Sequence, residues 1–580
     1  MSDTNIKEII VAAIDFGTTF SGYAYSWRDE YVRDPLKIYS NRWVGEGPPQ
    51  APTVVLFSND KMESYFGFEA EKKYADLTDK DEHENWRYFR RFKMDLHRTK
   101  KLTRTMTIED EQGRKMPAVE VFAAAIRHLK KHFMEQAENR IKLQENEIRW
   151  VITVPAIWND DAKEFMVEAA KMAGIREDKL SLAYEPEAAA IYCKQIRLAK
   201  LREQGKDATI QPFPPGFKFL VLDLGGGTVD ITAHEVQRDD TLQALMEPSG
   251  GKWGGTLVDD GFLETFEGLF GKEFMTGLKK DIENAESKRE LDNEIESKKK
   301  TIVGKSNPKA DCVISMKLPF AMMAKTKSAQ FKSALKGKQI EHKRDKIQIH
   351  NSILLTAFET SVSKIVAHLE MLLRKPELKR LDAIVMAGGF SESKVVQEEV
   401  KGVLKKYPRI ELIIPEDGGL AIVQGAVSYG FNPRIISTRR SRYSYGISTS
   451  VPFDIRIHPV VHRVKSRDGS YRCEDIFKVF VKKGEKVIPG QTTASYEFYP
   501  SQSAREHQTI EVYKSEADDP PMLITECQKV GFMRFTMPNS YITGKTVSVQ
   551  MKFGGTQVKV TADVNGLRGN EPMEASFEWL

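Results

Sequence analysis

Cysteine is scarce in this chain, and long hydrophobic runs are missing. Only four cysteines occur among 580 residues, and no two of them form a Cys-x-x-Cys pair. This scatter argues against a disulfide framework and against a zinc knuckle, and it fits a reducing compartment. The apolar run at 9–14 is too short for a signal peptide or a membrane-spanning helix. We therefore expect a cytoplasmic protein without a membrane span.

The chain also has little excess charge of either sign. Lysine and arginine number 87 against 82 aspartates and glutamates, which leaves a net charge of +5. No basic stretch is interleaved with aromatic residues in the way that nucleic-acid-binding surfaces need, so we expect no nucleic-acid partner. The composition, 41% hydrophobic and 29% charged, is that of a globular protein. Its length predicts two to four domains.

Two short segments share one design, and each follows an apolar run that predicts a buried strand. They are Ile14-Asp15-Phe16-Gly17-Thr18-Thr19 and Asp223-Leu224-Gly225-Gly226-Gly227-Thr228. Glycines let backbone N–H groups approach phosphate oxygens, threonine hydroxyls add donors, and an aspartate can orient a hydrated cation. Either segment alone is equally typical of an ordinary hairpin turn.

The repetition favours the phosphate interpretation. Each segment is followed by a further apolar strand, at 21–27 and at 229–236. The pattern predicts a phosphate loop between antiparallel strands, present twice, and it indicates a duplicated α/β domain with a cleft between its copies. From residue 443 onward, short β-branched and aromatic runs alternate with turn residues and predict a mostly β region. Residues 575–580 still alternate like a strand, so we expect no helical lid.

Several motifs resemble the heat shock protein 70 (Hsp70) family, whose nucleotide-binding lobes are similar to those of actin, hexokinase and sugar kinases. Besides the two segments above, the second of which runs on to Asp230, the motifs are Val154-Pro155-Ala156, Glu185-Pro186-Glu187-Ala188-Ala189-Ala190 and Gly388-Gly389. They occur in the family's order and cover residues 8–430. Phe92-Lys93-Met94 and the missing lid resemble the divergent branch typified by heat shock 70 kDa proteins 12A and 12B.

The resemblance implies a fold and its boundaries. We expect an α/β protein with two duplicated actin-like (ribonuclease H-like) lobes around a nucleotide cleft, followed by a mostly β C-terminal domain. Lobe I would span 1–200, lobe II 201–435, and the β-rich domain, a reduced version of a substrate-binding domain, 436–580.

The resemblance also implies ATP or ADP with magnesium as the bound cofactors. Asp15 and Asp223 would hold magnesium through water. Lys93 matches the family's γ-phosphate lysine, while Glu185 and Asp230 would orient water and magnesium, with Asp230 the better proton acceptor. The β- and γ-phosphates would be bound by Gly17, Thr18, Thr19, Gly225, Gly226, Gly227 and Thr228.

Each of the three candidate catalytic residues has a structural alternative. Lys93 lies in a basic patch at 90–93 that is typical of surface charge. Glu185 is also the kind of carboxylate that a helix dipole favours at a helix start. Asp230 is compatible with a simple turn. Only the placement of these residues beside the two loops separates the interpretations.

The adenosine end departs from the family pattern. Gly388-Gly389 would let the backbone approach adenosine closely. The serine and arginine that normally follow are replaced by Phe390 and Glu392, so the base pocket is altered. On the opposite wall Lys299 and Lys300 would stand where the family has a Lys-Arg pair, and lysine stacks less well than arginine.

The segment that follows the two lobes also departs from the family pattern. In the family an acidic, leucine-rich linker passes the nucleotide state to a peptide-binding β-sandwich, whereas residues 435–440 are basic here. We expect an ATP-binding, slowly hydrolysing chaperone-like protein that binds a client protein or peptide through 436–580, with a possible co-chaperone or exchange factor. The alternatives are a nucleotide-sensing adaptor with negligible hydrolysis and, less favoured, a metabolite kinase.

Overall fold

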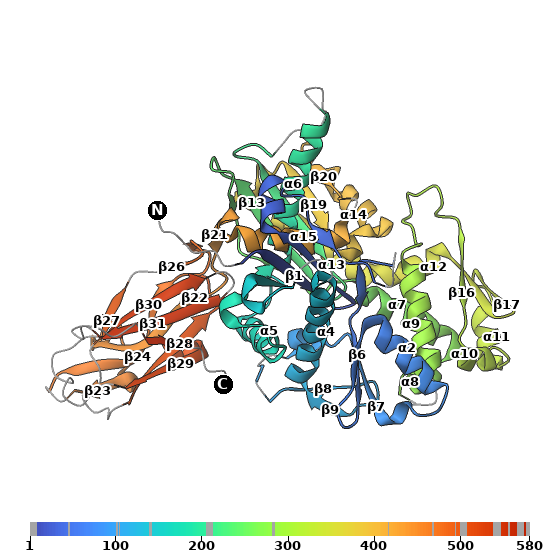
Figure 1. Cartoon of the computed structure of the whole chain (residues 1–580), viewed down its shortest axis with the longest axis horizontal. Helices are drawn as coiled ribbons and strands as arrows, with labels where there is room; N and C mark the ends of the chain where they lie inside the picture. The colour runs from blue at the N-terminus through green and yellow to red at the C-terminus, as the bar shows by residue number, and fades with distance from the viewer. Residues whose placement is uncertain are drawn as a thin grey trace.

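The structure is a computed structural model with a helix-rich body and a β-rich C-terminal region that extends to one side, coloured orange to red in Figure 1. It describes residues 8–43, 47–99, 102–103, 105–138, 142–204, 213–280, 285–415, 417–466, 469–492, 495–498, 507–536, 547–554, 557–564 and 573–575. The strand expected at 575–580 therefore lies outside the described residues, except for Ala575 at the end of β32 (Met573–Ala575).

The first mixed sheet contains the Asp15 segment. β1 (Ile10–Phe16) and β2 (Phe20–Trp27) form an antiparallel hairpin in which Asp15 is opposite Gly22, as the sequence predicts. β10 (Ile148–Val154) pairs with β1 in parallel, and β11 (Leu180–Tyr184) pairs with β10 in parallel. The short strands β3 (Tyr39–Ser40) and β4 (Gln50–Pro52) pair with β2.

The second mixed sheet contains the Asp223 segment in the same kind of hairpin. β12 (Lys218–Leu224) and β13 (Val229–Val236) are antiparallel, with Asp223 opposite Asp230. β19 (Ala383–Ala387) pairs with β12 in parallel and β20 (Glu411–Ile413) with β19 in parallel. The other side of β13 carries β14 (Leu242–Ala244) and β15 (Ser249–Gly251).

Alternation along the central strands divides the side chains among three cores. On β1, Ile10, Ala12 and Ile14 face one core, with α4 (Ala118–Glu138) and α5 (Asp160–Met172). On β12, Leu220, Leu222 and Leu224 face another core, with α7 (Thr256–Phe270), α13 (Glu359–Leu373) and α14 (Lys394–Leu404). The intervening side chains of both strands share a third core. The period of two thus gives each sheet two buried faces.

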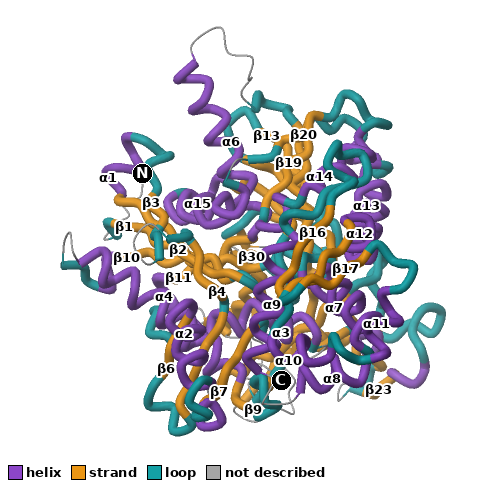
Figure 2. The backbone as a smooth tube through the Cα atoms, turned by 90° about the vertical axis from the view of Figure 1, so that its right-hand side faces the viewer, coloured by secondary structure: helices purple, strands orange, loops and turns teal. Residues whose placement is uncertain are grey.

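Two helices fill the space between the sheets. α6 (Glu185–Gln204) and α15 (Gly418–Phe431) each supply six of the 26 buried residues of the third core. Figure 2 shows α15 beside β1, β2 and β10. The helices pack closely because Gly425 faces the carbonyl of Ala188, where a Cβ atom would collide. This packing places the start of α6, with Glu185, next to both hairpins.

The C-terminal region is a sandwich of two antiparallel sheets, and it is mostly β, as the sequence predicts. One sheet contains β23 (Arg463–Lys465), β24 (Tyr471–Val481), β22 (Ser444–Pro452), β28 (His507–Ser515) and β29 (Gln528–Thr536). The other contains β26 (Gln491–Thr492), β27 (Tyr496–Phe498), β30 (Val547–Gly554), β31 (Gln557–Val564) and β32. Ile447, Val512, Val549 and Met551 belong to their shared core.

The basic segment before this sandwich is built into the second mixed sheet. β21 (Ile436–Arg440) pairs in parallel with β14 and antiparallel with β25 (Lys486–Val487). Smaller elements complete the body: α1 (Arg28–Arg33), β5 (Val54–Ser58), β6 (Ser64–Phe66), α2 (Gly67–Thr78), β7 (Trp86–Arg90), α3 (Lys93–Arg98), β8 (Thr107–Glu109), β9 (Lys115–Pro117), α8 (Lys272–Lys280), α9 (Ala285–Lys299), β16 (Val313–Lys317), α10 (Phe320–Lys325), α11 (Ala329–Leu335), β17 (Ile340–Lys343), β18 (Lys346–His350) and α12 (Asn351–Leu355). Within the described ranges, no helix is long and apolar enough to cross a membrane.

Candidate functional site

One cavity of about 190 Å³ lies between the two hairpin turns and collects most of the predicted site residues. Asp230 is buried but does not line the cavity. The predicted residues on the wall are Asp15, Gly17, Thr18, Thr19, Lys93, Glu185, Asp223, Gly225, Gly226, Gly227, Thr228, Lys299, Lys300, Gly388, Gly389 and Phe390. Residues from six separate parts of the sequence therefore face one space.

The two turns approach each other so closely that glycine is required at their contact. A Cβ atom on Gly227 would lie 2.7 Å from Thr18 Oγ1, and one on Gly226 would collide with Thr19 Oγ1. The second turn is closed by the Gly225 N–H, which donates to the Thr228 carbonyl at 2.9 Å. The hydroxyls of one turn therefore lie against the bare backbone of the other.

Lys93 and Glu185 form a buried ion pair on the cavity wall. Lys93 Nζ lies 2.8 Å from Glu185 Oε1, and the two residues are 5% and 7% exposed. Lys93 is the first residue of α3 and Glu185 the first of α6. The ammonium also lies 5.3 Å from the centre of the Trp158 ring, a cation–π distance. The surface-charge interpretation of Lys93 is therefore wrong.

Asp15, at the end of β1, is held by two side chains that the sequence patterns did not single out. Its Oδ1 accepts a hydrogen bond from Thr153 Oγ1 at 2.7 Å, and its Oδ2 accepts one from Gln50 Nε2 at 3.1 Å. Burial, and then the neighbouring Glu185 carboxylate, raise the pKa of Asp15 to about 6. A cation that enters the cavity would stabilise the ionised form of this carboxylate.

Asp223 and Asp230 are cross-strand neighbours with incomplete hydrogen bonding. The Ile157 N–H donates to Asp230 Oδ1 at 2.9 Å, whereas Asp230 Oδ2 and Asp223 Oδ1 are buried without a partner. Burial and the Glu185 carboxylate raise the pKa of Asp230 to about 7, and the same causes raise the pKa of Asp223 well above its ordinary value. Such unpaired carboxylate oxygens are costly unless a ligand or cation satisfies them.

The carboxylates fit a hydrated magnesium ion better than a directly ligated metal. Four carboxylates lie near the ammonium of Lys93: those of Asp15, Glu185, Asp223 and Asp230. Negative charge therefore exceeds positive charge around Lys93. Among the residues that the structure describes, no three His, Cys, Asp or Glu side chains are grouped to hold a metal. Magnesium that keeps its waters and binds phosphate oxygens needs only one or two carboxylates nearby.

The far end of the cavity is formed by the turn after β19 and by α9. Gly388 has φ +79°, and a Cβ atom there would lie 2.5 Å from both Asp223 Oδ1 and the Leu224 carbonyl. Phe390 is almost buried and stacks on Phe358, with ring centres 6.5 Å apart. This end is thus aromatic on one side.

Lysine forms the wall opposite these rings. Lys299 Nζ lies 2.9 Å from Asp259 Oδ1 and 2.5 Å from Glu296 Oε2, so its charge is already paired. Lys300 follows directly and also lines the cavity. Lys299 is therefore held in place by carboxylates, and one of them, Glu296, also lines the cavity.

Sequence reasoning missed the residues that support the aspartates. Thr153 left a signal, because it is a polar residue in the otherwise apolar end of β10. Gln50 and Ile157 left none, since an isolated glutamine at the start of a short strand and a backbone amide carry no pattern. Gly255, Phe358 and Gly419 also line the cavity without having been predicted.

Comparison with known proteins agrees with this geometry. The model of the family described as Hsp70 protein matches residues 40–437. Human heat shock 70 kDa protein 12B is 31% identical over 98% of this chain and 91% of its own length, and human heat shock 70 kDa protein 12A is 29% identical over 97% and 91%. The chaperone protein DnaK of Elusimicrobium minutum is 26% identical over 43% of this chain and 34% of its own length. The chain belongs to the Hsp70 family.

Proposed function

We propose that this protein is an ATP-binding, chaperone-like protein that hydrolyses ATP slowly with magnesium and couples its nucleotide state to the binding of a protein or peptide in the cytoplasm. The observation that carries this proposal is the single cavity lined by both hairpin turns, by the Lys93–Glu185 pair and by Gly388-Gly389. Hsp70 family members bind ATP or ADP, and here the predicted residues meet where a phosphate chain would need them.

We assign lobe I to 1–200, lobe II to 201–435 and the β-rich domain to 436–580, with lobe II a structural repeat of lobe I. The support is topological. In each mixed sheet the first strand of the hairpin pairs in parallel with a strand that follows much later in the chain, and that strand pairs in parallel with the next. The cavity lies between the two hairpins, as a cleft between repeats requires.

The chain's own residues supply positioning and charge for phosphoryl transfer. Magnesium, when bound beside Asp15 and Asp223, would neutralise charge on the phosphates. The threonine hydroxyls and glycine backbone of the two turns would hold the β- and γ-phosphates. Lys93, kept in place by Glu185, would stabilise charge that develops on the γ-phosphate. Asp230, with a pKa of about 7, would be the proton acceptor for the attacking water, and because it is buried behind the cavity wall a second water would relay the proton.

At the other end, the backbone at Gly388-Gly389 would accommodate adenosine, with the base between Phe390 and the stems of Lys299 and Lys300. Phe390 offers a flat apolar face and no hydrogen-bond donor. We therefore expect the base to be held by stacking and weakly selected, because stacking tolerates any purine.

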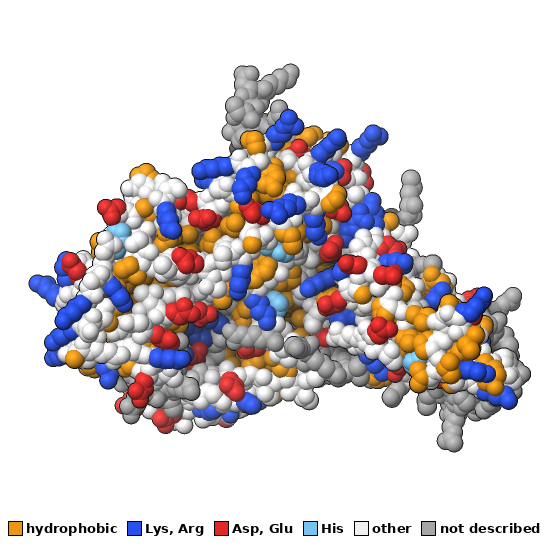
Figure 3. Space-filling view, turned by 180° about the vertical axis from the view of Figure 1, so that it is seen from behind, with side chains coloured by type: hydrophobic (Ala, Val, Ile, Leu, Met, Phe, Trp, Pro, Cys, Tyr) orange, Lys and Arg blue, Asp and Glu red, His pale blue; other side chains and the backbone are white. Residues whose placement is uncertain are grey.

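A client would bind through the β-rich domain. Ile455, Ile457, Val460 and Val461 are 73%, 62%, 63% and 85% exposed in the segment between β22 and β24. Figure 3 shows hydrophobic side chains gathered at this end of the molecule. Exposed apolar clusters of this kind are typical of protein-binding sites. We include a co-chaperone or exchange factor in the proposal only because membership of the Hsp70 family implies one.

The decisive experiment is single-turnover hydrolysis of labelled ATP with and without peptides. We expect slow turnover in wild type and a loss of at least about a hundredfold in Lys93→Ala and Asp230→Asn, since each removes a charge-placing group. Lys131→Ala on the exposed side of α4 is the matched control, and it should hydrolyse ATP at the wild-type rate.

Equal hydrolysis rates in wild type and the three variants would contradict the ATPase proposal. A thermal shift with Mg-ATP in the absence of turnover would then leave the adaptor function, for which the pairing of β21 with the lobe II sheet already provides a fixed connection. Phosphorylation of a small alcohol or acid in a substrate panel would instead identify a metabolite kinase.

A further inference from the structure

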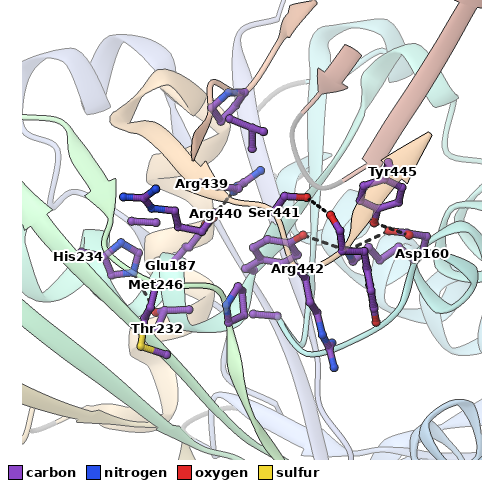
Figure 4. A pocket seen from close by; sticks show the side chains of 18 residues that line it. Asp160, Glu187, Thr232, His234, Met246, Arg439, Arg440, Ser441, Arg442 and Tyr445 are labelled. Atoms are coloured by element: carbon purple, nitrogen blue, oxygen red, sulfur yellow. Dashed lines mark hydrogen bonds and ion pairs between the residues drawn. The ribbon is translucent and has the colours of Figure 1, made fainter. Parts of the chain in front are cut away.

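A second cavity, separate from the nucleotide cleft, lies where the C-terminal region meets the two mixed sheets. Its volume of about 70 Å³ has room for a few water molecules or one small ligand. Figure 4 shows Arg439, Arg440 and Ser441 in its middle, with Glu187, Thr232 and His234 on one side and Asp160 and Tyr445 on the other.

The cavity carries an excess of positive charge. The charged side chains on its wall are four cations and two carboxylates: Lys163, Arg439, Arg440, Arg442, Asp160 and Glu187. His234 is neutral, because burial lowers its pKa to about 4. Lys514 adds a further cation 3.8 Å from Asp160. The buried cations Lys163, Arg439 and Lys514 are already paired with these two carboxylates. Arg440 and Arg442, which are partly exposed, have no carboxylate on this wall, and this arrangement favours an anion.

Three buried side-chain nitrogens on this wall also lack partners: His234 Nδ1, Arg439 Nη1 and Arg440 Nε. His234 Nε2 is bonded to Thr232 Oγ1 at 2.9 Å, whereas its Nδ1 has no partner. When the Thr232 hydroxyl donates to Nε2, neutral His234 carries its proton on Nδ1. Arg440 Nη1 donates to the Gly484 carbonyl at 3.1 Å, but its Nε is buried without an acceptor. Both atoms belong to residues that line the cavity.

We propose that this cavity binds a small oxyanion, either a carboxylate or a phosphate, whose oxygens accept hydrogen bonds from Arg440 Nε and His234 Nδ1. Charge-assisted hydrogen bonds from arginine to such oxygens are among the strong ones. His234 belongs to β13, Arg440 to β21, and Tyr445 on the same wall to the C-terminal sandwich. The anion therefore lies between lobe II, the linker strand β21 and the β-rich domain. Its binding favours the arrangement in which the β-rich domain packs against lobe II.

Isothermal titration calorimetry on the full chain tests the proposal, with sodium phosphate and sodium acetate as separate titrants and sodium chloride at equal ionic strength as reference. Saturating Mg-ADP keeps the nucleotide cleft occupied, so we expect one anion per chain at the second cavity, and the titrant that binds more tightly identifies the chemical source. Arg440→Met and His234→Phe should each weaken binding at least about tenfold, because each removes one donor while keeping the side-chain volume similar. Circular dichroism verifies that each variant is folded, and His234→Phe serves if Arg440→Met is not.

Two controls locate the anion. Arg434→Ala removes an exposed arginine just before β21 and should bind like wild type. Lys93→Ala alters the nucleotide cleft and should also leave binding unchanged. Loss of binding in Lys93→Ala with retention in Arg440→Met would put the anion in the cleft and overturn the proposal. Equal affinities in all variants, or no binding to wild type by either titrant, would do the same and leave a cavity that holds only water.

Discussion

Arg439 donates two hydrogen bonds to Glu187, from Nε to Oε1 at 2.8 Å and from Nη2 to Oε2 at 2.5 Å, and both residues are buried. Glu187 lies two residues after Glu185 at the start of α6. One end of this helix therefore contacts the nucleotide cleft through Glu185 and the linker strand β21 through Glu187. The basic linker is thus matched to a carboxylate of the body.

Arg439→Met should destabilise the protein by about 3–5 kcal/mol, because it leaves the buried Glu187 carboxylate uncompensated. The double variant Arg439→Met/Glu187→Leu should recover most of this loss, since both charges are then removed. Urea unfolding followed by fluorescence measures the three free energies. Arg434→Ala, an exposed neighbour, should stay within about 0.5 kcal/mol of wild type. A double variant no more stable than the single one would show that the pair is not the cause.

Gly388→Ala should destabilise the protein by about 1–3 kcal/mol and weaken nucleotide binding. The alanine would be strained at φ +79°, and its Cβ would displace Asp223 or the Leu224 carbonyl. Gly389→Ala is the matched control for stability, because open space surrounds a Cβ there. Thermal unfolding measures both. Equal losses in the two variants would mean that the close approach at Gly388 is not decisive.

Asp230→Asn should alter how stability depends on pH. The folded pKa of about 7 lies above the ordinary 3.8, so the protonated form is favoured by folding. This stabilisation is complete below pH 3.8 and is lost as the pH rises through 7. In EDTA, the melting temperature of wild type relative to Asp230→Asn should therefore fall between pH 6 and pH 8. A difference that is constant over this range would contradict the raised pKa.

Arg90→Gln should accelerate nucleotide release roughly five- to tenfold, the effect of losing about 1 kcal/mol of closure. Arg90 on β7 pairs with Asp292 on α9, and Arg91 with Asp259 2.8 Å away on α7, so these pairs join opposite sides of the cleft. Stopped-flow displacement of a fluorescent ADP analogue measures the rate. Arg127→Gln, on an exposed position of α4, should release the analogue like wild type. Added salt should leave most of the difference between wild type and Arg90→Gln, because the side chains of Arg90 and Asp292 are only 17% and 12% exposed and such pairs are weakly screened.

Much of the fold was predictable from local patterns. The two hairpins and the β-rich C-terminal region are both present, because period-two alternation and glycine-rich turns act within a few residues.

The candidate site was predictable only in part. The turns carry their own chemistry, so Asp15 and Asp223 with the glycines and threonines stood out without a structure. Lys93 depended on the family resemblance, because a lysine in a basic patch has no distinguishing local pattern. The aspartate supports Gln50 and Thr153 could not be assigned, since their role depends on which strand lies beside β1.

The sequence by itself determined the local chemistry: two phosphate-type turns, the strands that carry them, and the membership of a family. The tertiary structure alone decided which charges meet. Lys93 and Glu185 are 92 residues apart, and Arg439 and Glu187 are 252 residues apart, yet both pairs are buried contacts at the start of α6. Such pairs arise from how α6 packs between two sheets, and burial then makes each one specific, because an unpaired charge there would be too costly.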